Sequence, residues 1–138
     1  MGKEHAVLLV EDRNADARLV MEAFRMVDSK CTIDCVKDGV EALEYLSGKG
    51  AFKGKKMPDL ILLDIKLPRM DGKELLKEIK SSVTLRDIPV VMLTNSDTKE
   101  DIMESYEHQA NSYITKPVAL SDLVETAKYI EELWLGKK

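Results

Sequence analysis

The sequence predicts an α/β protein built on a doubly wound, five-stranded parallel sheet, with helices on both faces in a three-layer sandwich. Short apolar runs alternate five times with longer segments whose apolar residues recur at helical spacing. The runs at residues 7–10, 60–63 and 88–93 are apolar on both faces, which is typical of parallel strands covered by helices on either side. These two observations favour five consecutive β/α units.

The first two units occupy residues 7–46. A strand is expected at residues 7–10, followed by a helix whose apolar positions run from Ala15 to Val27, with Asn14 as its N-cap. The second unit combines a strand at residues 32–36 with a helix over residues 40–46. Each helix presents one apolar stripe, as a helix that packs on a sheet does.

The third unit begins with the strand at residues 60–63. Its helix is indicated by apolar residues at helical spacing up to Val83. Asp71 is expected to cap this helix, because Glu74 stands three residues further on and completes a capping box. Pro68 ends the extended segment that precedes the cap.

The last two units complete the sheet. A strand at residues 88–93 precedes a mostly polar helix at residues 101–107, and a strand at residues 112–115 precedes a helix at residues 121–135. Ser121 is expected to cap the start of that helix and Gly136 to end it. The polar helix at residues 101–107 has few apolar anchors, so we expect it to be the most movable of the five.

Length and charge predict one domain over residues 1–138. The formal charge is −4 and the two signs are interspersed, so we expect no direct nucleic-acid binding. The apolar runs are too short to span a membrane, and the sequence begins without a secretory signal, which predicts a cytoplasmic protein. Cys31 and Cys35 would lie roughly 13 Å apart on one strand, too far for a disulfide, and they lack the further ligands that a metal site or redox pair needs.

The glycine- and lysine-rich segment at residues 47–58 is expected to be an exposed loop. It differs from a phosphate-binding loop, because Gly50 and Gly54 enclose three residues instead of four and Lys55 is followed by a second lysine instead of Ser or Thr. We interpret it as a solvated insertion.

Five polar residues stand directly after predicted strands: Glu11, Asp12, Asp64, Thr94 and Lys116. In a doubly wound sheet the binding crevice lies outside the carboxyl ends of the strands, so these side chains are expected to converge. Each one alone is an ordinary solvated loop residue. Their occurrence at four separate strand ends favours a functional site.

The chemistry of this set points to a divalent cation and phosphoryl transfer. Three neighbouring carboxylates raise one another's pKa unless a cation neutralises them. Mg²⁺ takes one or two carboxylates together with water and phosphate oxygens, whereas Ca²⁺ prefers a denser set of oxygen ligands. Asp64 is the expected nucleophile, since a carboxylate forms an aspartyl phosphate, and Thr94 and Lys116 supply a hydroxyl and an ammonium for the transferred group.

With these residues, the whole chain closely resembles the response regulator receiver family, whose fold is flavodoxin-like. The motifs that carry the resemblance are the acid pair Glu11-Asp12, Asp64 after Leu62-Leu63, the loop at residues 67–72, Thr94 after Met92-Leu93, and Lys116-Pro117. The resemblance implies that Asp64 accepts a phosphoryl group from the phosphohistidine of a sensor histidine kinase in a Mg²⁺-dependent reaction.

The resemblance also implies roles for single residues. Glu11, Asp12, Asp64 and the backbone carbonyl of Lys66 would hold Mg²⁺, while Thr94 and Lys116 would bind the phosphoryl group. The Lys116-Pro117 peptide bond would be cis. Tyr113 would rotate inward behind Lys116, and the fourth helix, fifth strand and fifth helix would form the surface that binds an unknown downstream protein.

Within the family, the chain is similar to the single-domain regulators that accompany phytochrome-type sensor kinases. The long loop before Pro58 and the ending Glu132-Leu133-Trp134-Leu135 carry that similarity. Trp134 either pairs with a partner, including a second copy in a homodimer, or covers the edge of the core. His5 and His108 lack metal-ligand spacing and are expected to be ordinary surface or strand-edge residues.

Two features depart from the common family pattern. Gln109 stands where a glycine often ends the fourth helix, so either the turn is rearranged or Gln109 adopts a positive φ. Lys66 and Ser96 occupy positions that influence the rate of dephosphorylation in this family, which leaves the lifetime of the phosphoryl group open.

Two other functions remain as alternatives. A Mg²⁺-dependent hydrolase of the aspartyl-phosphatase class also uses an Asp at a strand end, but it typically has a second Asp two residues later, where this chain has Lys66. A non-phosphorylated interaction module of the same fold is expected to have lost some of the five strand-end residues, and all five are present.

Overall fold

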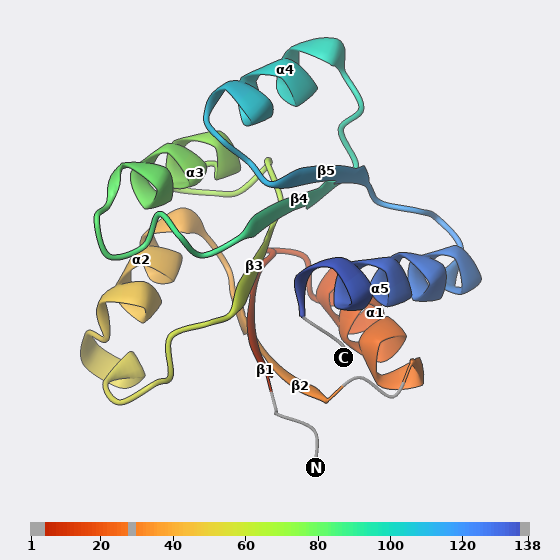
Figure 1. Ribbon diagram of the computed structural model, residues 1–138, viewed down its shortest axis with the longest axis horizontal. Helices are drawn as coiled ribbons and strands as arrows, with labels where there is room; N and C mark the ends of the chain where they lie inside the picture. Colours follow the sequence, from red (N-terminus) through yellow and green to blue (C-terminus); the bar gives the residue numbers. More distant parts are fainter. Residues whose placement is uncertain (1–4, 28–29, 136–138) are drawn as a thin grey trace.

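The computed structural model describes residues 5–27 and 30–135. Five strands form one parallel sheet in the order β2-β1-β3-β4-β5, which confirms the predicted doubly wound fold (Figure 1). The strands are β1 (His5–Val10), β2 (Cys31–Val36), β3 (Leu60–Leu63), β4 (Val90–Thr94) and β5 (Ser112–Thr115). The helices are α1 (Asn14–Met26), α2 (Gly39–Ser47), α3 (Gly72–Ser81), α4 (Lys99–Glu107) and α5 (Leu120–Trp134), with a short 3₁₀ helix at Gly50–Phe52.

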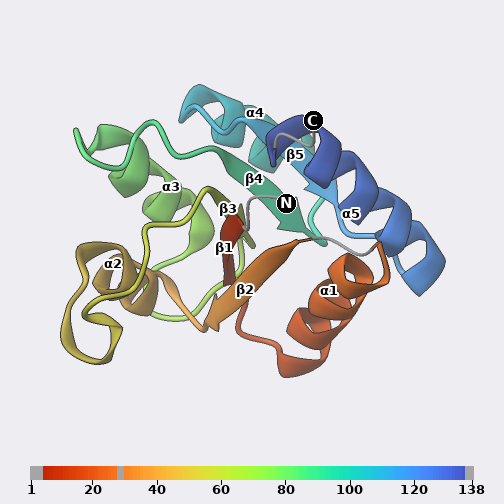
Figure 2. The same ribbon diagram turned by 60° about the horizontal axis from the view of Figure 1, so that its bottom comes forward.

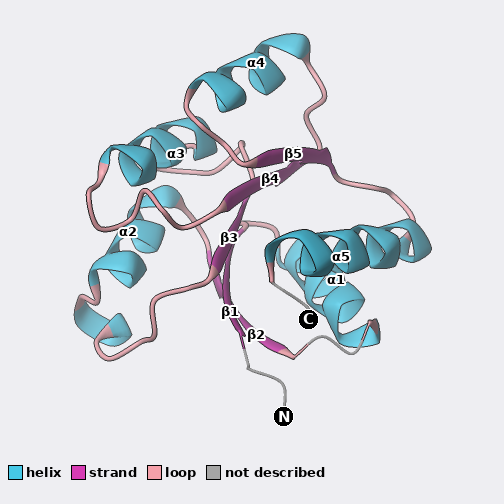
Figure 3. Ribbon diagram, in the orientation of Figure 1, coloured by secondary structure: helices cyan, strands magenta, loops and turns pink. Residues whose placement is uncertain are grey.

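The sheet separates two apolar cores, one on each face. Helices α1 and α5 pack side by side on one face, while α2 and α3 cover the other and α4 lies beside α3 (Figures 2 and 3). Alternate residues of β1 point into the two cores: Leu8 and Val10 face α2 and α3, and Val7 and Leu9 face α1 and α5. The central strands β3 and β4 are buried throughout, as their unbroken apolar runs predicted.

Several predicted helix ends are wrong by a few residues. Arg13 is the N-cap of α1, and Asn14 is its first residue, with its side-chain oxygen bonded to Lys37. Ala119 precedes α5 in the cap position, so Ser121 lies inside the helix. Helix α3 ends at Ser81, which leaves Val83 in an exposed turn. The expected role of Gly136 lies outside the described residues.

Two other local predictions are confirmed. Asp71 and Glu74 form the expected capping box at the start of α3: the Asp71 carboxylate accepts the Glu74 N–H at 2.9 Å, and Glu74 accepts the Asp71 N–H at 3.3 Å. Cys31 and Cys35 both lie on β2 and form no disulfide.

The turn after α4 shows which of two alternatives holds at Gln109. Its φ is +73°, and the N–H of Ala110 bonds to the Ser105 carbonyl at 3.0 Å, which closes the helix in the manner usually provided by glycine. The helix therefore ends in the turn that glycine usually forms, and Gln109 adopts the strained left-handed conformation that this turn requires.

Trp134 covers the edge of a core. It is partly buried against the α1–α5 core, and Leu135 after it is 2% exposed. Of the described helices, none is long and apolar enough to cross a membrane.

Candidate functional site

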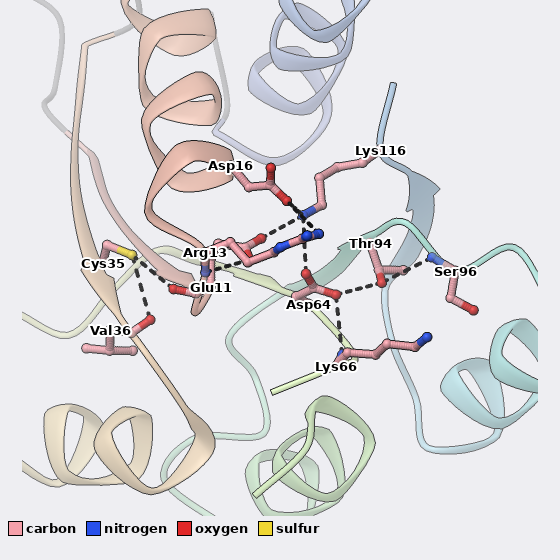
Figure 4. A network of polar contacts seen from close by, with 10 residues as sticks. All are labelled: Glu11, Arg13, Asp16, Cys35, Val36, Asp64, Lys66, Thr94, Ser96 and Lys116. Carbon is pink, nitrogen blue, oxygen red and sulfur yellow. Dashed lines mark hydrogen bonds and ion pairs between the residues drawn. The ribbon is translucent and has the colours of Figure 1, made fainter. Parts of the chain in front are cut away.

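The candidate site lies at the carboxyl ends of β1, β3, β4 and β5 (Figure 4). Glu11 directly follows β1, and its N–H donates to the Val36 carbonyl at 2.9 Å, which continues the β1–β2 ladder by one residue. Its side chain turns into the protein and is 2% exposed. One carboxylate oxygen, Oε2, accepts the Arg13 N–H at 3.2 Å, so the loop after β1 fixes the orientation of Glu11.

Asp64 follows β3 and is held from both sides. Its N–H donates to the Val10 carbonyl at 3.2 Å, which sets it next to the end of β1. Behind it, Gly72 approaches so closely that a Cβ there would lie 2.0 Å from the Asp64 carbonyl oxygen. The Gly72 N–H donates to the Ile65 carbonyl at 2.7 Å. Only glycine fits this position, so the loop at residues 67–72 fixes the backbone of Asp64.

The strands β4 and β5 bring Thr94 and Lys116 to Asp64. The Thr94 hydroxyl donates to Asp64 Oδ1 at 2.6 Å, and the Lys116 ammonium lies 3.2 Å from Asp64 Oδ2. The Lys116 N–H donates to the Thr94 carbonyl at 2.7 Å, which joins the two strand ends. One carboxylate therefore receives a hydroxyl and an ammonium on its two oxygens.

The ammonium of Lys116 contacts three carboxylates. Besides Asp64, it lies 2.6 Å from Glu11 Oε1 and 3.1 Å from Asp16 Oδ2, while the Lys116 side chain is 6% exposed. Burial by itself lowers the pKa of Lys116, but Glu11, Asp64 and Asp16 raise it above its usual range. Lys116 is thus held charged in a buried position.

The carboxylates of the site outnumber its cations, and Glu11 has a raised pKa. Burial, and to a lesser extent the nearby Asp64, raises the pKa of Glu11 above its ordinary value, although Lys116 acts in the opposite direction. Ionised Glu11, Asp64 and Asp16 carry three negative charges, against one on buried Lys116 and one on Arg13, an exposed residue 3.9 Å from Asp16. A divalent cation bound between these acids would offset the remaining negative charge.

The predicted metal ligands are only partly brought together. Glu11 and Asp64 both contact the Lys116 ammonium, whereas Asp12 is an exposed residue of the loop after β1. Among the described residues, no three His, Cys, Asp or Glu side chains form a group ready to hold a metal ion. Two convergent carboxylates with water are nevertheless a donor set that Mg²⁺ accepts, so the residues fit this ion if Lys116 gives way.

Lys66 lies where its backbone can reach Asp64. Its N–H donates to Asp64 Oδ1 at 3.4 Å, and its side chain is exposed (Figure 4). The Lys116-Pro117 peptide bond is trans, so the expectation of a cis bond is wrong for this structure. The trans form is the lower in free energy before proline, and it allows the Lys116 contacts described above.

Tyr113 connects the site to α4. Its ring packs partly buried against the α2–α3 core, and its hydroxyl donates to the Ser96 carbonyl at 2.7 Å. The Ser96 hydroxyl bonds to Asp101 in α4, and Asp101 also accepts the Lys73 ammonium of α3 at 2.8 Å. Lys73 further lies 2.5 Å from Glu104, so a polar network joins β5, the loop after β4, α3 and α4.

Three polar contacts were not foreseen from the sequence: those of Asp16, Lys73 and Arg69. Arg69 adopts a φ of +64° and pairs through Nε and a terminal nitrogen with Asp38, the cap of α2, at 2.9 and 3.1 Å. Local charge patterns do not predict these contacts, because Lys116, Asp101 and Asp38, the partners of the three residues, lie on other elements. A left-handed arginine in particular has no signal in composition.

Comparison with known proteins agrees with this geometry. Residues 7–128 match the response regulator receiver domain family. The chain belongs to this family. A receiver domain serves phosphorylation-dependent signalling in two-component systems, and the predicted resemblance is thereby confirmed.

Individual relatives align with this chain over most of the length of both proteins. The probable methanogenesis regulatory protein FilR2 of Methanothrix harundinacea is 44% identical over 131 residues, which cover 94% of this chain and 83% of FilR2. The crystal structure of the phosphorylated cyanobacterial phytochrome response regulator RcpA is 46% identical with a TM-score of 0.91, covering 97% of this chain and 96% of RcpA. The Mn²⁺-bound form of response regulator Rcp1 is 40% identical with a TM-score of 0.87, covering 97% of this chain and 96% of Rcp1.

Proposed function

We propose that residues 1–138 form one cytoplasmic receiver domain whose Asp64 accepts a phosphoryl group from the phosphohistidine of a sensor histidine kinase. The contact that carries the proposal is the pairing of Asp64 Oδ1 with the Thr94 hydroxyl and of Oδ2 with the Lys116 ammonium, at 2.6 and 3.2 Å. Both partners are hydrogen-bond donors, and donors of this kind stabilise the charge that gathers on a transferring phosphoryl group, which supports the proposal.

In the proposed reaction an Asp64 carboxylate oxygen attacks the phosphorus of phosphohistidine. The new O–P bond forms as the N–P bond breaks, and the histidine nitrogen keeps the electron pair of the broken bond. Glu11, Asp12, Asp64 and the Lys66 carbonyl are the proposed ligands of Mg²⁺, which when bound neutralises charge on the acids and on the phosphoryl oxygens. Thr94 and Lys116 orient the group during transfer and retain it afterwards.

We further propose a phosphoacceptor switch and not a turnover hydrolase. The position two residues after Asp64 is Lys66, whose exposed ammonium cannot serve as the second carboxylate that the aspartyl-phosphatase class typically uses. A non-phosphorylated module is disfavoured because Glu11, Asp64, Thr94 and Lys116 are all present and in contact.

The phosphoryl signal is proposed to leave through the surface of α4, β5 and α5. Helix α4 buries Ser105 and little else, which agrees with the predicted movable helix. Exposed apolar side chains lie along this surface: Met103, Tyr106, Val118, Tyr129 and Leu133. They suit contact with a downstream protein or with a second copy of the chain.

The structure limits how much free energy the switch can use. Two charge-assisted hydrogen bonds are worth about 3 to 6 kcal/mol, and a shift from 1:99 to 99:1 needs about 5.5 kcal/mol. Thr94 and Lys116 already bond to Asp64, however. Only the difference in free energy between their bonds to Asp64 and their bonds to a phosphoryl group favours the active conformation. We therefore expect phosphorylation without a bound partner to shift the equilibrium between the inactive and active conformations incompletely.

Mass spectrometry of the intact chain tests the proposal. With acetyl phosphate and Mg²⁺ we expect one phosphoryl group per chain, none without Mg²⁺, and none on Asp64→Asn. Asp87→Asn removes an exposed carboxyl from the loop before β4 and serves as the matched control that remains labelled. Equal labelling of Asp64→Asn and wild type would overturn the assignment of the acceptor.

A further inference from the structure

Asp16, in the first turn of α1, contacts the site without belonging to the proposed metal or phosphoryl ligands. Its Oδ2 lies 3.1 Å from the Lys116 ammonium, and its side chain is 25% exposed, against 2% for Glu11 (Figure 4). Arg13 is its other cationic neighbour, at 3.9 Å and with a side chain that is 67% exposed. Asp16 thus stands at the outer side of the ammonium.

The three partners of Lys116 match the three N–H bonds of an ammonium group. Two of these partners, Glu11 and Asp64, are also proposed ligands of the divalent cation. A cation that binds to them competes with Lys116 for the same oxygens and repels its charge. Lys116 therefore has to release Glu11, and Asp16 is the carboxylate that the metal does not use.

We propose that Asp16 is a positioning residue that retains the Lys116 ammonium beside Asp64 while a divalent cation binds between Glu11 and Asp64. This inference rests on the proposed function of the site. Without Asp16, the only carboxylate partners of Lys116 are the two metal-binding acids. A cation that binds to these acids would then have to displace Lys116 without another carboxylate to receive its ammonium. Asp16 contacts Lys116 without metal as well, but it becomes one of only two partners once the cation occupies Glu11. The contact then contributes more, and this difference favours metal binding.

Two simpler roles for Asp16 predict different behaviour. As a negative charge acting at a distance, Asp16 would attract a divalent cation whether or not Lys116 is present. As an acid in the first turn of α1, it would stabilise that helix and leave the metal affinity unchanged. Only a positioning role makes the effect of Asp16 depend on Lys116.

A double-mutant cycle on the full chain separates these roles, with Mg²⁺ affinity measured by isothermal titration calorimetry in the absence of a phosphodonor. We expect Asp16→Asn to weaken Mg²⁺ binding about fivefold. The Asp16–Lys116 contact exists without metal too, so only the amount by which it strengthens when Lys116 leaves Glu11 affects the affinity. In a Lys116→Met background the same change should alter affinity less than about twofold, since the coupling is lost. Asp97→Asn, which removes an exposed carboxyl from the loop after β4, controls for general charge.

The outcomes are distinct. An equal loss from Asp16→Asn with and without Lys116 would overturn the positioning role in favour of a field effect. Normal Mg²⁺ binding by Asp16→Asn would overturn it in favour of a helix-stabilising role. Failure of the wild type to bind Mg²⁺ would overturn the proposed metal site and this inference together, whereas normal wild-type binding confines any failure to Asp16.

Discussion

Replacing Lys116 with methionine removes the one ammonium that contacts Glu11, Asp16 and Asp64 in the described site. Methionine keeps the length of the aliphatic chain, so the change is mainly one of charge. Loss of one partner of a buried ion pair costs about 3 to 5 kcal/mol. Because the acids can take up protons as their pKa values rise, we expect about 3 kcal/mol at pH 7 without metal.

Urea unfolding with and without Mg²⁺ measures this effect. Mg²⁺ replaces the missing charge, so Lys116→Met should gain more free energy of unfolding from saturating Mg²⁺ than the wild type does. Lower pH should also narrow the difference in free energy of unfolding between Lys116→Met and wild type. Burial already raises the pKa of Glu11, and loss of the Lys116 ammonium raises it further. The folded variant then binds protons more readily than the unfolded chain does, so its stability increases as pH falls from 7 toward 5.

The control is Lys128→Met on α5. Its side chain is 54% exposed and its ammonium pairs with Glu125 at 3.7 Å, so the free energy of unfolding should change by less than about 0.5 kcal/mol. Two results would refute the view that Lys116 and the divalent cation neutralise the same acids. One is equal stability of Lys116→Met and wild type in metal-free buffer, and the other is an equal gain in free energy of unfolding from Mg²⁺.

Three further variants test other parts of the structure. Gln109→Gly should raise the free energy of unfolding by about 0.5 to 1 kcal/mol in urea, because relief of the left-handed strain exceeds the entropy that glycine adds to the unfolded chain; no gain would contradict that strain. Lys73→Met should lose about 1 kcal/mol at neutral pH, whereas the exposed Lys77→Met should not. Lys73 lowers the pKa of Asp101, so this contribution is present above the ordinary Asp pKa of 3.8 and disappears as pH falls below it; an unchanged difference at pH 3 would argue against the pair. Tyr113→Phe should lose about 1 kcal/mol of stability yet accept phosphate from acetyl phosphate at a rate within about twofold of wild type, and a large loss of rate would place its hydroxyl in the transfer step.

The sheet was predictable because apolar runs and helical stripes are local signals. The order of the strands placed Glu11, Asp64, Thr94 and Lys116 at one edge, and the structure brings these four side chains into contact. Helix boundaries were less predictable. Backbone hydrogen bonds, and not the best capping side chain, decide where α1 and α5 begin, so Asn14 and Ser121 fall inside the helices.

Contacts between elements that are distant in sequence were not predictable from local patterns. Asp16 and Lys116 are 100 residues apart, and Lys73 reaches Asp101 across 28 residues. Such pairs depend on how α1 meets β5 and how α3 meets α4. The conformation of the peptide bond before Pro117 likewise depends on tertiary context, since the local preference between the two isomers is small.

Mapping the phosphorylated residue tests the central claim most directly. After incubation with acetyl phosphate and Mg²⁺, borohydride reduction converts an aspartyl phosphate into a stable alcohol, which peptide mass spectrometry assigns to one position. The account predicts modification at Asp64 alone, lost when Mg²⁺ is chelated. Modification at Asp12 or Asp71 in its place, or a yield at Asp64 that does not depend on Mg²⁺, would contradict it.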